Sequence, residues 1–122
     1  MSNPIIQIKR AYAPATTQDG WRILVDRLWP RVSKKETAQV KDWDKNVAPS
    51  TELRKWFGHE EDKWPEFQKK YKLELKENKT ALESLIELVK KHPVVTLLYA
   101  AKDDSHNNAV VLREVLINML KK

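Results

Sequence analysis

The sequence contains no cysteine and only two glycines in 122 residues. Without cysteine, disulfide bonds, thiolate metal ligands and thiol nucleophiles are excluded from any account of its stability or chemistry. The two glycines, Gly20 and Gly58, lie far apart, so neither a glycine-rich phosphate loop nor a dinucleotide-binding fingerprint is present. We therefore expect no nucleotide cofactor, and the lack of cysteine favours a reducing compartment.

Long hydrophobic runs are also missing. No apolar stretch approaches the roughly 20 residues that span a bilayer, and no charged and then apolar leader precedes a small-residue cleavage site. The sequence therefore predicts a cytoplasmic protein without a membrane partner. Its length is typical of one domain over residues 1–122, and a hydrophobic content of 41% is enough for a single core.

Basic residues outnumber acidic ones, with 23 Lys and Arg against 17 Asp and Glu and a formal net charge of +6. Clustered basic residues would indicate a nucleic-acid partner, because they neutralise phosphates. Here the two signs are interleaved, most clearly between His59 and Lys79, as on a solvated helix face. A nucleic-acid-binding or transcription-regulatory role is therefore the second interpretation, supported by tryptophans that lie among arginines.

Hydrophobic periodicity predicts strands that alternate with helices. The unbroken apolar run of residues 94–101 is typical of a strand buried on both faces, so we place it in the middle of the sheet. Other strands are expected at residues 5–12 and 23–25, with a weaker one near 42–47. Helices are expected at 51–57, 64–75, 80–92 and 109–120, with a single helical turn at 34–39.

Capping residues define the ends of several predicted helices. Ser50 and Gly58 bound the first one, Thr80 forms a capping box with Glu83, and Asp104 or Ser105 could cap the last helix. Together the elements predict an α/β fold: a single domain with a small, mostly parallel central sheet flanked by helices, three-layered and Rossmann-like. The short connection between the first two strands leaves open whether they are parallel.

Ligands of such sheets bind beyond the carboxyl ends of the strands, where two polar clusters are expected. The first cluster, residues 26–31, places two guanidiniums around the ring of Trp29. Arg27 shares a strand face with Ile23 and Val25, and it could present a fixed fork to a carboxylate or phosphate. A structural ion pair of Arg27 with Asp26 or Asp103 is the alternative.

The second cluster, residues 102–108, joins the central strand to the last helix. The start of a helix offers free backbone N–H groups and a positive dipole end, which favour anions. His106, Asn107 and Asn108 are poor helix formers, so their side chains are expected to contact something, and His106 could exchange protons near neutral pH. Satisfying the backbone groups of the loop is the alternative role.

We therefore predict a pocket that binds a small anionic ligand. The protein could also be an enzyme, whose reaction the sequence does not define. Candidate catalytic residues are His106, Asp26 and Asp103. Candidate ligand-binding residues are Arg10, Arg27, Trp29, Arg31, Lys102, Asn107 and Asn108. No metal site is expected, because the acidic residues beside His59 are typical of a helix entry. A third interpretation is a protein-interaction module without catalysis, in which Trp29 and its neighbours form an exposed patch.

Three long motifs, in this order along the chain, carry a family resemblance. They are DGWRILVDRLWPR (residues 19–31), VAPSTELRKWFGH (47–59), and TLLYAAKD with HNNAVVL (96–103 and 106–112). The sequence resembles the YeaO-like family, small bacterial proteins grouped as a domain of unknown function, over nearly its whole length. The resemblance implies a bacterial cytosolic protein with an α/β fold, and it supplies no substrate, cofactor or catalytic residue. Val32 stands where typical members have a glycine.

Overall fold

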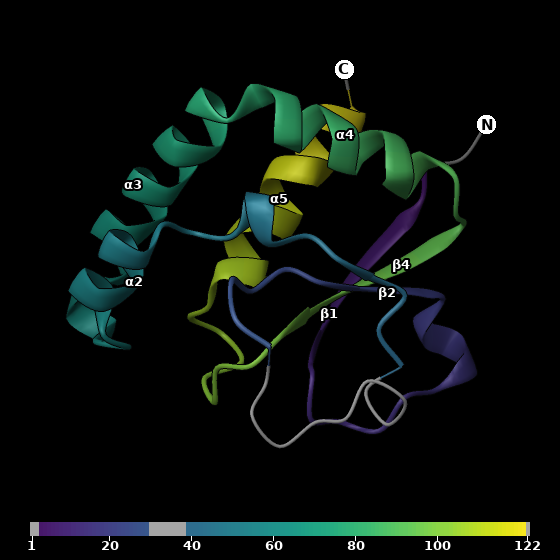
Figure 1. Ribbon diagram of the computed structural model, residues 1–122, viewed down its shortest axis with the longest axis horizontal. Helices are drawn as coiled ribbons and strands as arrows, with labels where there is room; N and C mark the ends of the chain where they lie inside the picture. The colour runs from purple at the N-terminus through teal and green to yellow at the C-terminus, as the bar shows by residue number, and fades with distance from the viewer. Residues whose placement is uncertain (1–2, 30–38, 122) are drawn as a thin grey trace.

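The computed structural model describes residues 3–29 and 39–121, whose strands form one parallel sheet (Figure 1). The strands are β1 (Ile5–Arg10), β2 (Trp21–Leu24), β3 (Asp42–Trp43) and β4 (Val94–Tyr99). Their order is β1-β4-β2-β3, and every pair is parallel. The predicted α/β fold with a central apolar strand is thus confirmed. β1 and β2 are parallel to each other, with β4 between them.

Four helices contribute to one core with the sheet. They are α2 (Thr51–Phe57), α3 (Trp64–Glu77), α4 (Lys79–Lys90) and α5 (Asn108–Leu120). In Figure 1, α5 lies between the strands and the arch of α3 and α4, and it contacts β1 and β4. Short 3-10 helices occur at η1 (Thr17–Asp19), η2 (Lys45–Val47) and η3 (Glu61–Lys63). No helix of the described chain is long and apolar enough to cross a membrane.

The two faces of the sheet are covered differently. Alternate strand residues such as Ile23 and Leu97 join the large core that the helices share. Leu24 and Leu98 point to the opposite face, where a smaller cluster contains no residue of an α-helix. Among residues 3–29 and 39–121 the α-helices therefore cover one face, and the three-layer detail of the prediction is not seen. The predicted turn at 34–39 falls, apart from its last residue, outside the described residues.

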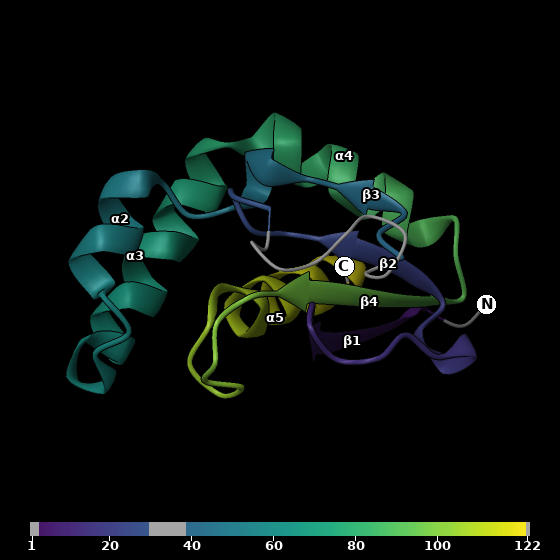
Figure 2. The same cartoon turned by 60° about the horizontal axis from the view of Figure 1, so that its bottom comes forward.

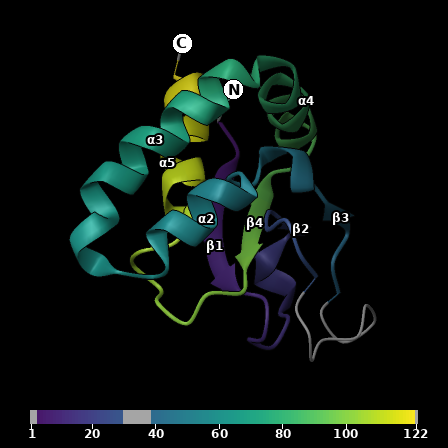
Figure 3. The ribbon, with the colours of Figure 1, turned by 60° about the vertical axis from the view of Figure 1, so that its left-hand side comes forward.

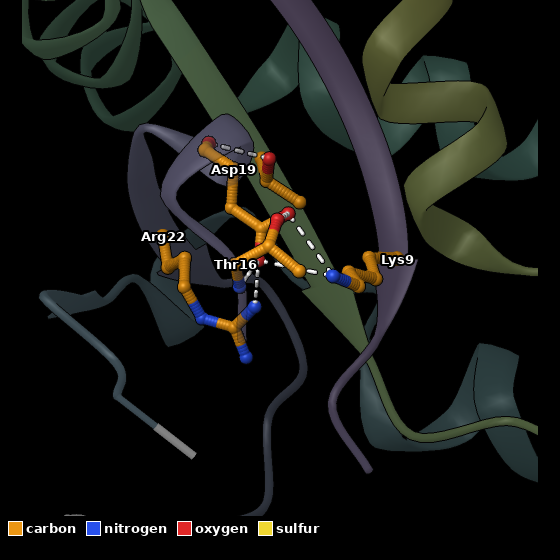
Figure 4. A network of polar contacts seen from close by, with 5 residues as sticks. Lys9, Thr16, Asp19 and Arg22 are labelled. Atoms are coloured by element: carbon orange, nitrogen blue, oxygen red, sulfur yellow. Dashed lines mark hydrogen bonds and ion pairs between the residues drawn. The ribbon is translucent and has the colours of Figure 1, made fainter. Parts of the chain in front are cut away.

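A buried ionic network occupies this second face (Figure 4). The Asp19 carboxylate accepts hydrogen bonds from Lys9 Nζ at 3.0 Å, from Arg22 and from Thr16, while Thr96 Oγ1 donates to the Asp19 carbonyl oxygen at 2.6 Å. Burial alone would raise the pKa of Asp19, but these hydrogen bonds outweigh it and lower the pKa to about 2. The network ties η1 to β1, β2 and β4.

The backbone conformation explains why glycine occupies positions 20 and 58. Gly20 has a φ of +64°, and a Cβ there would lie 2.2 Å from the Val94 carbonyl oxygen, so only glycine lets η1 approach β4. Gly58 is left-handed at the end of α2, and the Ser50 side chain accepts a hydrogen bond from the Leu53 N–H at its start. The predicted caps of this helix are confirmed.

Two other capping predictions are wrong. α4 already begins at Lys79, directly after Asn78 ends α3, so Thr80 lies within the helix and forms no capping box. α5 is capped by Asn107, whose Oδ1 accepts a hydrogen bond from the Val110 N–H at 3.1 Å, rather than by Asp104 or Ser105. The preceding loop folds on itself before the helix begins, which moves the cap further along the chain.

Candidate functional site

A cavity of about 590 Å³ lies at the carboxyl-terminal edge of the sheet. Segments after β2 and β4 form one side and α2 forms the other. Figure 2 shows the arrowhead of β4 pointing toward the side on which α2 and the loop before α5 lie. The lining residues are Tyr12, Asp26, Arg27, Leu28, Trp29, Pro49, Thr51, Arg54, Lys55, Phe57, His59, Phe67, Ala100, Ala101, His106, Asn107 and Asn108.

The structure brings part of each predicted cluster to this cavity. The predicted site residues that line it are Asp26, Arg27, Trp29, His106, Asn107 and Asn108. Arg10, Lys102 and Asp103 do not line it. The Arg10 Nε donates to the Ala101 carbonyl oxygen at 3.1 Å, and Lys102 is exposed. Arg31 lies outside the described residues.

Asp26 is the only acidic residue among the described residues that line the cavity. Its Oδ2 accepts a hydrogen bond from the Ala100 N–H at 2.8 Å, which joins the ends of β2 and β4. Burial raises the pKa of this carboxyl, and it outweighs the lowering by the Ala100 and Asn108 hydrogen bonds and by the charges of Arg54 and His59. Asp26 makes no ion pair with any residue in the described ranges.

Arg27 connects the end of β2 to the chain that enters α2. Its Nε donates to the Pro49 carbonyl oxygen at 3.2 Å, and its Nη2 lies 3.4 Å from the Ala48 carbonyl oxygen. Neither of the ion pairs considered from the sequence, with Asp26 or Asp103, forms in the described structure. A guanidinium has five N–H donors, and the contacts seen among the described residues use only part of them while they hold the chain that enters α2.

The loop before α5 is organised by Asp103. Its Oδ1 accepts hydrogen bonds from the backbone N–H groups of Ser105 and His106, and its Oδ2 lies 2.8 Å from Nδ1 of His106. The Ser105 N–H, followed by the His106 side chain, lowers the pKa of Asp103. The imidazole also meets the Trp64 ring edge-on at 5.1 Å. Asp103 therefore orients His106 from outside the cavity, with Nδ1 engaged and Nε2 not held by this carboxylate.

Asn107 and Asn108 are used mainly by the fold. Asn107 is 2% exposed, and besides capping α5 its Nδ2 donates to the Asp103 carbonyl oxygen at 2.9 Å. The Asn108 Nδ2 donates to the Val25 carbonyl oxygen at 3.0 Å. Asn107 thus satisfies a backbone group of the loop, as in the alternative role, whereas Asn108 joins the start of α5 to the chain at the end of β2.

Sequence reasoning missed the contribution of α2. Arg54 and Lys55 are exposed at the rim of the cavity, and their side chains make no hydrogen bond or ion pair with any described residue. His59 also lines the cavity, in a left-handed conformation with a φ of 60°. That conformation is uncommon outside glycine and turns the chain sharply after α2. The helical stripe of α2 identified its buried face but gave no sign of what its exposed face would meet.

One group in the described chain could offer three metal ligands: Glu61, Asp103 and His106, whose ligand atoms lie within 4.8 Å of one another. Glu61 is exposed, and the other two are only half-buried and already bonded to each other. Exposed acidic groups of this kind are common in proteins without a metal, so the group assigns no ion.

The chain is similar to several proteins of bacteria. Residues 5–122 match the family described as "Inactive DUF488-N3 subclade". "Uncharacterized protein YeaO" of Escherichia coli (strain K12) is 47% identical over 111 residues, which cover 91% of this chain and 96% of that protein. "Uncharacterized protein Rv3073c" of Mycobacterium tuberculosis (strain ATCC 25618 / H37Rv) is 37% identical over 111 residues, covering 91% and 92%. No solved structure gives a significant match.

Proposed function

Because the chain belongs to the YeaO-like family, within the inactive DUF488-N3 subclade, we propose that it binds a small organic anion without transforming it. The observation that carries the proposal is the cavity at the sheet edge, whose cations Arg27, Arg54 and Lys55 have no ion-pair partner among the described residues. Its volume lies within the range of about 300–1,000 Å³ that is usual for small-molecule sites.

The lining supports a ligand with an apolar part as well as a charge. Phe57 and Phe67 reach the cavity from the core side. At the mouth, Leu28 is 61% exposed and Tyr12 is 37% exposed. Exposed apolar side chains beside a concave site are typical of binding surfaces. We therefore favour an organic phosphate or carboxylate over a bare inorganic ion.

The alternatives drawn from the sequence keep a lower rank. Catalysis by His106, Asp26 and Asp103 stays a prediction, and the family description "inactive" argues against it. The described residues offer no observation that favours nucleic acid or a protein partner over a small anion. The cytoplasmic location also stays a prediction.

A charge-matched pair of variants tests the proposal. Phenyl phosphate is titrated into the protein while backbone amide signals are followed by NMR, in the wild type and in the Arg54→Gln/Lys55→Gln variant. Each partly exposed charge pair contributes about 0.5–1 kcal/mol, so the variant should bind about 5- to 30-fold more weakly. The control is Lys76→Gln/Lys79→Gln, which removes the same charge from exposed positions outside the cavity. Equal losses in both variants would reduce the effect to net charge and refute the site.

A further inference from the structure

The carboxylate of Asp26 lines a cavity that we propose binds an anion, where a negative charge is unexpected. It is the single acid among the described lining residues, and a negative charge there repels the ligand that Arg54 and Lys55 would attract. It is also costly for the fold, because a half-buried carboxylate without an ion-pair partner among the described residues gives up part of its hydration. These two costs point to a role for Asp26 in recognition.

Holding the ends of β2 and β4 together does not by itself require an acid. The Ala100 N–H needs one acceptor oxygen from residue 26, and an asparagine carbonyl could supply it. The ionised carboxyl differs from an amide because it only accepts hydrogen bonds, in about four directions. Among the described residues the Ala100 N–H is the donor whose hydrogen bond to this carboxylate is seen, so acceptor capacity remains on a side chain that lines the cavity.

The charges are arranged around Asp26 in a way that suits a ligand of mixed character. Cationic Arg54 and Lys55 reach the cavity from α2, whereas Asp26 reaches it from the chain that follows β2. Burial raises the pKa of the Asp26 carboxyl and the charge of Arg54 opposes this rise, so an anion bound beside Arg54 would also lie near Asp26. In the ribbon of Figure 3, α2 passes in front of the strands, and α3 lies beside it. The parts of the anion that α2 does not hold would therefore face Asp26. An ionised carboxylate only accepts hydrogen bonds, so these parts must donate one to bind there.

We propose that Asp26 is a specificity-determining residue, which selects anions that also carry hydroxyl donors, as in a phosphorylated sugar unit. This inference rests on the proposed anion site. The phosphate is bound by Arg54 and Lys55, and sugar hydroxyls donate to the free acceptor positions of Asp26. The sugar phosphate could be free or part of a nucleotide, and both share this chemistry. Anions of equal charge without hydroxyls bind more weakly because they desolvate the remaining acceptor positions of Asp26 without supplying a donor to them.

The test compares two nucleotides that differ only in their sugar hydroxyls, together with a sugar phosphate that lacks the base. Adenosine monophosphate, its 2′,3′-dideoxy analogue and ribose 5-phosphate are titrated into wild type, Asp26→Asn and the control Asp62→Asn, an exposed residue outside the cavity. Hydrogen bonds to a charged group discriminate by about tenfold or more. The wild type and Asp62→Asn should prefer the hydroxylated nucleotide by that factor, and Asp26→Asn should lose most of the preference.

The outcomes separate this inference from the proposed function. If all three phosphates bind but the wild type does not prefer the hydroxylated nucleotide, Asp26 has no such role and the anion site stands. A preference that survives in Asp26→Asn likewise overturns the role of Asp26 and leaves the anion site intact. If none of the phosphates binds, the anion site itself is refuted. Tighter binding of the nucleotide than of ribose 5-phosphate identifies the nucleotide as the source, and equal binding identifies the sugar phosphate. The preference of the wild type needs no variant, so a folding defect in Asp26→Asn cannot hide the result.

Discussion

The buried network around Asp19 should make the free energy of unfolding fall at low pH. The substitution Asp19→Asn should remove this pH dependence. Its carboxylate is 4% exposed and bonded to Lys9, Arg22 and Thr16. These bonds lower its pKa from 3.8 to about 2. At about 1.4 kcal/mol for each pKa unit, the ionised form contributes about 2 kcal/mol to the free energy of unfolding. The contribution is complete above the unfolded pKa of 3.8 and is lost as the pH falls toward the folded value of about 2.

We expect Asp19→Asn to destabilise the protein at pH 7 by about 3–5 kcal/mol, because it leaves buried Arg22 without this charged partner. The difference from wild type should shrink by about 2 kcal/mol between pH 5 and pH 2, where the wild type itself loses the charge. Urea unfolding at several pH values, followed by tryptophan fluorescence, measures both numbers. Asp62→Asn, at an exposed site, is the control. A difference that stays constant down to pH 2 would show that the network does not hold the Asp19 charge.

Two further predictions concern buried Tyr71 and half-buried Asp26. Tyr71 is fully buried and donates to the Val47 carbonyl oxygen at 2.5 Å, so Tyr71→Phe should lower the free energy of unfolding by about 1–3 kcal/mol; an unchanged urea midpoint would contradict this. Burial raises the pKa of Asp26, so the contribution of this carboxyl to the free energy of unfolding falls as the pH rises above the unfolded value of 3.8. Asp26→Asn does not lose this contribution, so it should gain thermal stability relative to wild type between pH 4 and pH 7. Melting curves with no such divergence would remove the claim that its charge is costly.

Much of the fold follows from local patterns. Ser50 and Gly58 bound a helix because a side-chain oxygen and a left-handed glycine satisfy the ends of α2 wherever the helix lies. The apolar run of β4 indicates burial on both faces, which only a central strand experiences. The strand order β1-β4-β2-β3 is a long-range property. No local pattern distinguishes it from other parallel arrangements.

The candidate site was partly predictable for one geometric reason. The carboxyl ends of parallel strands meet at the same edge of a sheet, so residues after β2 and β4 converge wherever those strands pair. Arg54 and Lys55 could not be found this way. They lie on the exposed face of a short helix, and their position over the sheet edge depends on the tertiary contacts of α2 with α3 and on the bonds from Arg27 to the chain before it.

The most direct measurement follows backbone amide signals while adenosine monophosphate is added to the wild-type protein. The proposed site predicts saturable shifts at residues 26–29, 54–59 and 100–108 together, with smaller shifts in the Arg54→Gln/Lys55→Gln variant at the same ligand concentration. Shifts confined to exposed lysines elsewhere, or none at millimolar ligand, would contradict the claim that this cavity binds organic anions.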